Sequence, residues 1–199
     1  DCLDPVTGLA SLADRSVDHV ISDPPYDEHT HGAARQNATG YKEACSSSRA
    51  AISRNMDLGF DPLTDDQMRQ LAVEFERVCR RWVAVFCTVE MISSWRASIE
   101  AAGLEYVRCC VWDRIGGAPQ FTGDRPGMAV EAIVVAHRKG RKRWNAGGKR
   151  GIYRHPIVLN RGGNSERLHT TQKPLDLMRE LVEDFTDEND TILDPFAGS

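Results

Sequence analysis

The chain has 199 residues, of which 41% are hydrophobic and 27% are charged, with a formal net charge of −4. This length and composition indicate one soluble globular domain and exclude a disordered, collagen-like or disulfide-rich chain. No apolar run approaches the roughly 18 residues that cross a membrane, and the first residues do not resemble a signal peptide, so we expect a cytoplasmic protein with no membrane partner.

Short apolar runs and helical repeats alternate along the chain. The apolar runs predict strands at residues 16–22, 83–88, 104–112, 129–137 and 191–196. Apolar residues at every third or fourth position predict helices at 64–82, at 91–102 and from Pro174 to Phe185. Thr64 and Gln67 form a capping-box pattern, and Gly103 is placed to end the second helix. This alternation predicts a three-layer α/β domain with a mainly parallel sheet.

Two connections, at about 27–61 and about 138–168, are long for a compact domain, and loops of this length are usually functional or disordered. The second is basic: between Glu131 and Glu166 there are nine Lys and Arg residues and no acidic residue. With Trp144 and Tyr153 interleaved, this composition suits nucleic acid, where cations meet phosphates and rings stack on bases. A solvated loop is the alternative interpretation.

Cysteine and histidine usage indicates no metal site. None of the six cysteines forms a CxxC pair, and several lie inside apolar runs, which predicts reduced cysteines in the core. His29 and His31 form an HxH pattern, but nothing else at ligand spacing accompanies them.

Two segments end a predicted strand with an aspartate followed by a proline. They are "ISDPPY", at 21–26, and "ILDPFAGS", at 192–199. Ligands of open α/β sheets bind beyond the carboxyl ends of the strands, so both segments are expected at one crevice. Gly198 would let the backbone approach a ligand closely. Either segment by itself is a weak signal.

Together, and in this order, the segments resemble the DNA amino-methyltransferases that use S-adenosylmethionine, in their circularly permuted β-type group. There the catalytic Asp-Pro-Pro-Tyr motif comes first and the cofactor motif Asp-Pro-Phe-x-Gly-x-Gly comes last. The matching pieces are residues 1–26, the "VWDRIGG" and "VEAIVVAHRKG" segments, and residues 169–199. The resemblance implies a Rossmann-like methyltransferase fold, with 1–199 as one domain and an insertion at about 27–61.

The resemblance also implies roles for individual residues. The catalytic motif is Asp23, Pro24, Pro25 and Tyr26. Asp23 and the Pro24 carbonyl would accept hydrogen bonds from the target amine, since a proline pair presents carbonyls in a set geometry. Tyr26 would stack on a base flipped out of the duplex, although packing in the core is the alternative.

For the cofactor, the resemblance assigns Asp194, Pro195, Phe196, Ala197, Gly198, Ser199, His169, Thr171, Gln172, Lys173, Asp1 and Cys2. For Asp1, a terminal residue without a role is the alternative. The family pattern continues beyond "DPFAGS", so either residues after Ser199 complete the site, or the motif is truncated and the protein is an inactive relative.

The expected partner is double-stranded DNA, bound mainly through the basic segment at about 138–168, with the 27–61 insertion closing over the flipped base. The residues assigned to DNA are Arg138, Lys139, Arg141, Lys142, Arg143, Trp144, Lys149, Arg150 and Arg154. A homodimer and a restriction endonuclease partner stay open, and the resemblance implies a bacterial or phage-encoded protein.

The expected reaction is methylation of N6 of adenine, because aspartate at the first motif position is usual for the adenine enzymes of this family. Methylation of N4 of cytosine is the close alternative. The same chemistry on RNA or on a protein amide nitrogen is a second interpretation. A non-catalytic nucleic-acid-binding relative is the third.

Overall fold

The computed structural model describes residues 1–26, 61–117, 123–158 and 172–197. In these ranges six strands form one sheet in the order β5-β3-β4-β2-β1-β6. The strands are β1 (His19–Ser22), β2 (Trp82–Cys87), β3 (Glu105–Ile115), β4 (Val130–His137), β5 (Ile152–Pro156) and β6 (Ile192–Leu193). The helices are α2 (Asp65–Val78), α3 (Ile92–Ala101) and α4 (Leu175–Phe185), with short 3-10 turns η1 (Leu9–Ser11) and η2 (Val89–Met91).

The sheet is mixed but mainly parallel, as predicted. β1 pairs in parallel with β2 and β6, and β3 pairs in parallel with β5. β4 is antiparallel to both of its neighbours, β2 and β3, and so runs opposite to the other described strands. The carboxyl ends of β1, β2, β3, β5 and β6 therefore lie at one edge of the sheet, together with the start of β4.

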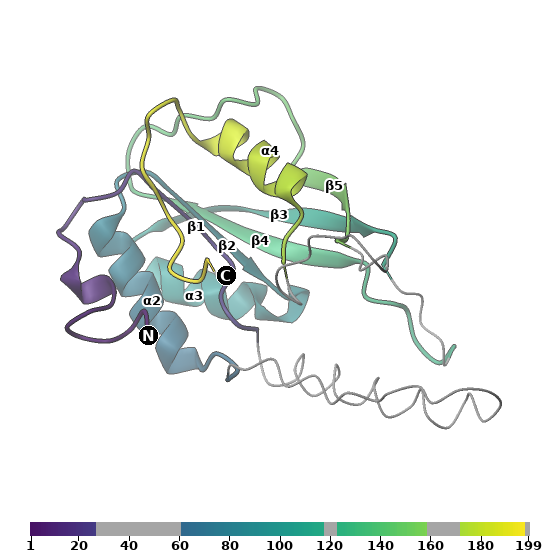
Figure 1. Ribbon diagram of the computed structural model, residues 1–199, viewed down its shortest axis with the longest axis horizontal. Coiled ribbons are helices and arrows are strands. Elements are labelled where there is room, and N and C mark those ends of the chain that lie inside the picture. The colour runs from purple at the N-terminus through teal and green to yellow at the C-terminus, as the bar shows by residue number, and fades with distance from the viewer. Residues whose placement is uncertain (27–60, 118–122, 159–171, 198–199) are drawn as a thin grey trace, which may run out of the picture.

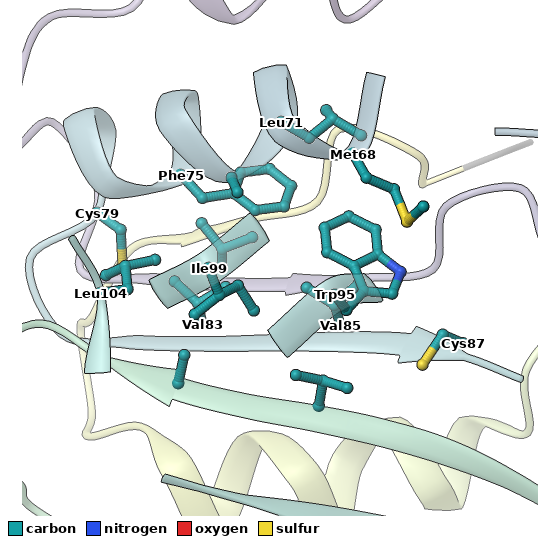
Figure 2. Packing of buried hydrophobic residues seen from close by; sticks show 14 of the residues in the cluster. Met68, Leu71, Phe75, Cys79, Val83, Val85, Cys87, Trp95, Ile99 and Leu104 are labelled. Carbon is teal, nitrogen blue, oxygen red and sulfur yellow. The ribbon is translucent and has the colours of Figure 1, made fainter. Parts of the chain in front are cut away.

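Helices cover both faces of the sheet (Figure 1). On one face, α2 and α3 pack against β2 and β4, and Figure 2 shows Phe75 and Trp95 above Val83 and Val85. On the other face, α4 packs its buried Leu177 and Leu181 against the sheet. Because both faces of β2 and β4 are covered, β2 is a continuous apolar run and β4 is interrupted only by Glu131 before it ends at His137. The three-layer α/β prediction is confirmed.

Local signals also place the helix ends where the sequence indicated. The Thr64 hydroxyl accepts a hydrogen bond from the Gln67 amide, and the Gln67 side chain returns to the Thr64 amide, which completes the capping box at the start of α2. Gly103 follows α3 with a φ of 98°, a conformation that a residue with a Cβ rarely adopts. Both predictions are confirmed.

Three expectations about the elements need correction. The first helix ends at Val78 instead of residue 82, because the Arg80 and Arg81 amides donate to carbonyls just before β1 and join the sheet. The strand expected at 191–196 is only two residues long. The expected loop at 138–168 is wrong at Ile152–Pro156, which forms β5 at the end of the sheet.

The cysteines in the described part of the chain are free, and Cys79, Cys87 and Cys110 are buried. The expectation of core cysteines is confirmed for these three, whereas Cys2 and Cys109 are partly buried and Cys45 lies outside the described residues. No helix in the described part of the chain is long and apolar enough to cross a membrane.

Candidate functional site

The two Asp-Pro motifs lie side by side at the carboxyl edge of the sheet. Asp23 follows β1 and Asp194 follows β6, and these two strands are parallel neighbours. The Ser22 hydroxyl donates a 2.9 Å hydrogen bond to Oδ1 of Asp194, and the Asp23 amide also interacts with that carboxylate. The prediction that both motifs meet at one edge is therefore confirmed.

A cluster of charged and polar side chains surrounds Asp23. Nζ of Lys173 lies 2.5 Å from Oδ2 of Asp23 and 3.3 Å from Oε2 of Glu131. The Tyr26 hydroxyl donates to Oε2 of Glu131 over 2.7 Å and lies 3.2 Å from Oδ1 of Asp23. Arg114 pairs with the other oxygen of Glu131 at 3.2 Å. We call Asp23, Tyr26, Arg114, Glu131 and Lys173 the Asp23 cluster.

Burial and charge act in opposite directions on Asp23. Burial is the larger effect and raises the pKa of the carboxyl above its usual value, whereas the positive charge and hydrogen bond of Lys173 oppose this rise. Burial and the neighbouring carboxylates raise the pKa of Tyr26 well above its usual value, so the phenol keeps its proton. The cluster thus combines a carboxylate acceptor with a neutral hydroxyl donor.

Glu131 and Arg114 were not predicted as site residues. Glu131 is the acidic residue inside the otherwise apolar run "AVEAIVVAH", and its side chain is only 10% exposed in the structure. A lone charge in a buried strand is the signal that could have identified it, because buried charges need partners. For Arg114, at the end of β3, we find no comparable signal.

The predicted cofactor residues lie in several places. Phe196 donates its amide to Oδ1 of Asp194 over 3.0 Å, and its side chain packs against the hydrophobic cluster below α2 and α3. Cys2 packs against the same cluster, whereas Asp1 is exposed and accepts a hydrogen bond from the Leu3 amide. Pro195 is partly buried and Ala197 is exposed.

Lys173 and Gln172 precede α4, and Lys173 contacts Asp23 directly. His169, Thr171, Gly198 and Ser199 lie outside the described residues. The assignment of these residues to the cofactor stays a prediction.

The motif prolines and the described residues that flank the 27–61 insertion lie at the same edge. Pro24 is buried and Pro25 is partly buried. The Leu63 amide donates to the Tyr26 carbonyl over 3.3 Å. The described residues on either side of the insertion therefore meet beside the Asp23 cluster. The insertion itself, residues 27–60, lies outside the described residues.

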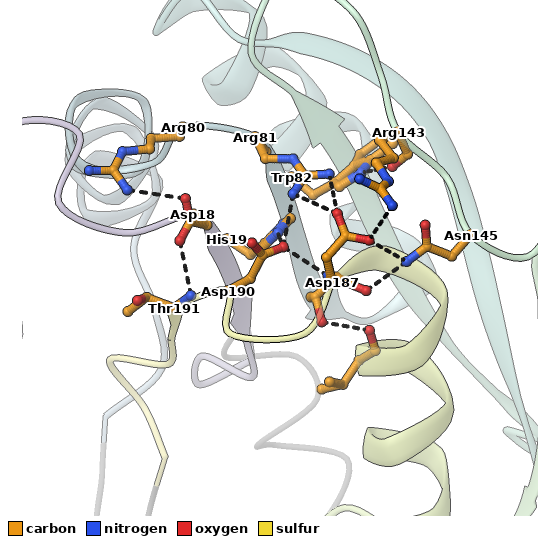
Figure 3. A network of polar contacts seen from close by, with 12 residues as sticks. Asp18, His19, Arg80, Arg81, Trp82, Arg143, Asn145, Asp187, Asp190 and Thr191 are labelled. Atoms are coloured by element: carbon orange, nitrogen blue, oxygen red, sulfur yellow. Dashed lines mark hydrogen bonds and ion pairs between the residues drawn. The ribbon is translucent and has the colours of Figure 1, made fainter.

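The start of the basic segment lies at the opposite edge of the sheet from Asp23, because it follows β4, the strand of reversed direction. Several of its cations form ion pairs within the protein. The pairs are Arg138–Glu76, Lys142–Glu105, Arg143–Asp187, Lys149–Glu180, Lys149–Asp184 and Arg154–Asp113. Figure 3 shows Arg143 and Asn145 directed toward Asp187 in the turn after α4.

The structure thus does not bring the first part of the basic segment to the catalytic motif. Arg154 lies farther along, on β5, near the edge that carries Asp23. Lys139, Arg141 and Arg150 are exposed and form no ion pair with any described residue. Their assignment to DNA stays a prediction, as does that of the paired cations.

The two aromatic residues of the basic segment face the protein. Tyr153 is 0% exposed and donates its hydroxyl to Asp184 over 2.9 Å. The expectation that Tyr153 is free to stack on a base is therefore wrong. Trp144 is partly buried, with its ring centroid 4.9 Å from that of Phe185, and it donates its N–H to the Gly147 carbonyl.

Comparison with known proteins gives matches over most of the chain. A family model described as DNA methylase, covering N6 and N4 methyltransferases, matches residues 17–199. The type II methyltransferase M.HhaII of Haemophilus parahaemolyticus is 29% identical over 147 residues, which cover 68% of this chain and 58% of M.HhaII. YubD of Escherichia coli K12 is 24% identical over 201 residues, covering all of this chain and 74% of YubD.

Two solved structures share the fold. The complex of M1.HpyAVI with SAM has a TM-score of 0.60 and 20% identity, and the match covers 95% of this chain and 75% of that one. TTHA0409 of Thermus thermophilus, solved with S-adenosyl-L-methionine, has a TM-score of 0.54 and 18% identity, with 96% and 75% coverage. The expected Rossmann-like methyltransferase fold is confirmed. The chain spans less than two thirds of the length of M.HhaII.

Proposed function

Because the chain belongs to the DNA methylase family of N6 and N4 methyltransferases, we propose that it transfers a methyl group from S-adenosylmethionine to an exocyclic amine of DNA. The observation that carries this proposal is the hydrogen bond between Ser22 and Asp194. It joins the two motifs, so a base held at Asp23 and a methyl donor held at Asp194 would meet at one edge. The name of M.HhaII, a type II methyltransferase, supports the same activity.

The residues at this edge fit S-adenosylmethionine, which is positively charged at sulfur. Three carboxylates, those of Asp23, Glu131 and Asp194, gather here with two cations. Asp194, Phe196 and Cys2 would hold the molecule, because they line the strand end and the adjoining hydrophobic cluster. When bound, S-adenosylmethionine supplies a methyl group activated by the sulfonium.

Asp23 would activate the target amine. An exocyclic amino nitrogen is a poor nucleophile because its lone pair is delocalised into the base. By accepting the N–H hydrogens, the Asp23 carboxylate and the Pro24 carbonyl would favour a pyramidal nitrogen with an available lone pair. Holding that nitrogen in line with the methyl group would supply much of the rate by orientation. The proton released from the methylated nitrogen would pass to Asp23 or to water.

We propose N6 of adenine as the target, with N4 of cytosine as the alternative. Both amines present the same pair of N–H groups, so the position of Asp23 suits either. Support for adenine is the aspartate at the first position of the motif, which the family resemblance associates with adenine enzymes.

The target amine is paired inside a duplex, so the base must be flipped out to reach Asp23. Tyr26 would stack on it, because its ring is held next to Asp23 by the bond from its hydroxyl to Glu131. Exposed cations without internal ion pairs would bind phosphates away from the flipped base. In the described part of the basic segment these are Lys139, Arg141 and Arg150.

Labelled S-adenosylmethionine incubated with unmethylated duplex DNA, followed by mass spectrometry of the nucleosides, tests the proposal. N6-methyladenine supports the first choice, and N4-methylcytosine supports the alternative. Asp23→Asn should abolish transfer, since it keeps the shape and removes the charge, whereas binding of S-adenosylmethionine should largely persist through the other residues of the site. DNA binding without any methylated product would contradict the proposal and indicate a non-catalytic relative.

A further inference from the structure

We propose that Lys173 is a positioning residue for Asp23, which it keeps ionised and aligned, and that Glu131 holds Lys173 in place for this task. This inference deepens the proposed function and rests on it, because the proposed role of Asp23, accepting an N–H hydrogen of the target amine, needs the ionised carboxylate as the stronger acceptor. The sequence resemblance instead assigned Lys173 to the cofactor.

The charges of the Asp23 cluster balance only when Lys173 is present. Asp23 and Glu131 are the acids, and Arg114 and Lys173 are the bases. Arg114 contacts Glu131, so Lys173 is the cation paired with Asp23 among the described residues. An unpaired carboxylate in a largely buried site takes up a proton instead of remaining charged. Removal of Lys173 would therefore favour the protonated form of Asp23.

Protein groups surround the ammonium group of Lys173. Nζ lies 5.4 Å from the ring centroid of Tyr26 and 5.1 Å from that of Phe86, and it also donates to the Tyr26 hydroxyl. The Lys173 side chain is 11% exposed. With Asp23 and Glu131 as ion-pair partners, this ammonium is directed toward the catalytic carboxylate.

Glu131 holds this arrangement together. Its carboxylate accepts from Tyr26 and pairs with both Lys173 and Arg114, so it links the segment before α4 with the ends of β1 and β3. Its negative charge raises the pKa of Asp23, which is opposite to the effect of Lys173. Its contribution is therefore to position Lys173 and Tyr26, and the charge of Lys173 is what keeps Asp23 ionised.

Within the described part of the chain, the titratable groups that face Asp23 come from several elements. They are Tyr26 after β1, Cys87 at the end of β2, Glu131 on β4, Asp194 after β6 and Lys173 before α4. Cys87 and Tyr26 are neutral, because burial raises the pKa of both. Lys173 is the positively charged member of this set, so replacing it with a neutral residue should raise the pKa of Asp23.

Carboxyl-carbon NMR of protein labelled at aspartate measures the ionisation of Asp23 without any substrate, and Asp23→Asn identifies the signal. A cation at this distance lowers a carboxyl pKa by about 1–3 units, so Lys173→Met should raise the Asp23 titration by that amount. Lys173→Arg should restore it. Lys149→Met, which removes a cation paired with Asp184 and Glu180, is the matched control and should leave Asp23 unchanged.

Methyl transfer gives the second measurement. In Lys173→Met the acidic limb of kcat/KM should move to higher pH by the same amount, with an unchanged Kd for S-adenosylmethionine. Glu131→Gln should lower kcat without moving this limb upward. The proposal would be overturned if the Asp23 titration were unchanged in Lys173→Met. It would also be overturned if this variant bound S-adenosylmethionine more weakly while the acidic limb of kcat/KM stayed at the same pH, which would indicate that Lys173 binds the cofactor. If the wild-type protein transferred no methyl group, the proposed function would fail, while the NMR titration would still decide the role of Lys173.

Discussion

The hydroxyl of Ser22 and the carboxylate of Asp194 lie 2.9 Å apart across 172 positions of sequence. Ser22 ends β1, and Asp194 directly follows β6, which has only two residues. So short a strand forms few backbone bonds to its neighbour, and this side-chain bond contributes more to fixing its end than it would in a longer strand. The contact therefore fixes the last motif against the first.

Ser22→Ala should loosen the end of β6. The Asp194 carboxylate would keep its bonds to the amides of Asp23 and Phe196 but lose the hydroxyl, and hydrogen bonds to charged groups contribute about 1.5–3 kcal/mol. We expect a loss of that order in the free energy of unfolding, measured with urea, together with weaker binding of S-adenosylmethionine. Ser93→Ala, on the exposed side of α3, is the control and should stay within about 0.5 kcal/mol. Equal effects of the two substitutions would contradict the structural role of the Ser22 bond.

Tyr26 combines a ring and a hydroxyl whose contributions can be separated. Tyr26→Phe removes the bond to Glu131 but keeps the ring, whereas Tyr26→Ala removes both. If the ring stacks on the flipped base, Tyr26→Ala should weaken binding of DNA with an unpaired target base by about 1–3 kcal/mol, or roughly 5- to 150-fold. Tyr26→Phe should keep most of that affinity in the same titration. Equal losses in the two variants would indicate that the hydroxyl, and not stacking, is what matters.

The sequence predicts the central strands well because burial on both faces leaves a simple signal. β2 is apolar throughout and β4 is apolar apart from Glu131 and His137, and the expected strand ranges agree with the structure within a few residues. β5 gives no such signal, because it lies at the end of the sheet and only Tyr153 within it is buried. Short end strands of this kind are fixed by their neighbours more than by their own pattern.

The site divides in the same way. Asp23 and Asp194 were predictable because Asp23 directly follows one predicted strand and Asp194 lies in the last part of another, and carboxyl ends of parallel strands share an edge. The contact of Lys173 with Asp23 was not, since 150 positions separate the two residues and no local pattern pairs them. Likewise, the basic composition of 138–154 does not reveal that acids from distant segments neutralise many of its charges.

The basic segment should divide into DNA-binding and structural cations. Arg141 and Arg150 are exposed and form no ion pair within the described part of the chain, so replacing both with Ala should weaken DNA binding at little cost in stability. Removing one cation that neutralises a phosphate should reduce the slope of log K against log salt by about 0.9. Lys149→Met should do the opposite, lowering stability by about 1–3 kcal/mol with an unchanged slope, because it leaves Asp184 without its cation. Fluorescence anisotropy at several salt concentrations and urea unfolding measure the two effects. An unchanged slope in the double variant would indicate that Arg141 and Arg150 are solvated surface residues that do not contact DNA phosphates.

The last prediction concerns His137, which ends β4 at the edge opposite Asp23. Its ring is buried against Trp82, with centroids 4.4 Å apart, and its Nε2 has no hydrogen-bond partner among the described residues. Burial, reinforced by Lys142 and Arg81, lowers the pKa of His137 to about 4. The histidine pKa in the unfolded chain is about 6.5. Between the two pKa values, His137 is therefore protonated in the unfolded chain and neutral in the folded protein. The stability that depends on neutral His137 is complete above a pH of about 6.5 and is lost as the pH falls toward about 4.

Urea unfolding at several values between about pH 7 and about pH 5 measures this loss, which for one group approaches about 1.4 kcal/mol per pH unit. His137→Phe keeps a ring against Trp82 and removes the titration, so its stability should fall less steeply over the same range. A residual slope is expected from His19, because burial lowers its pKa as well. His19→Phe in the same background should reduce that residual further. Identical slopes for the wild-type protein and His137→Phe would show that His137 does not resist protonation in the folded state.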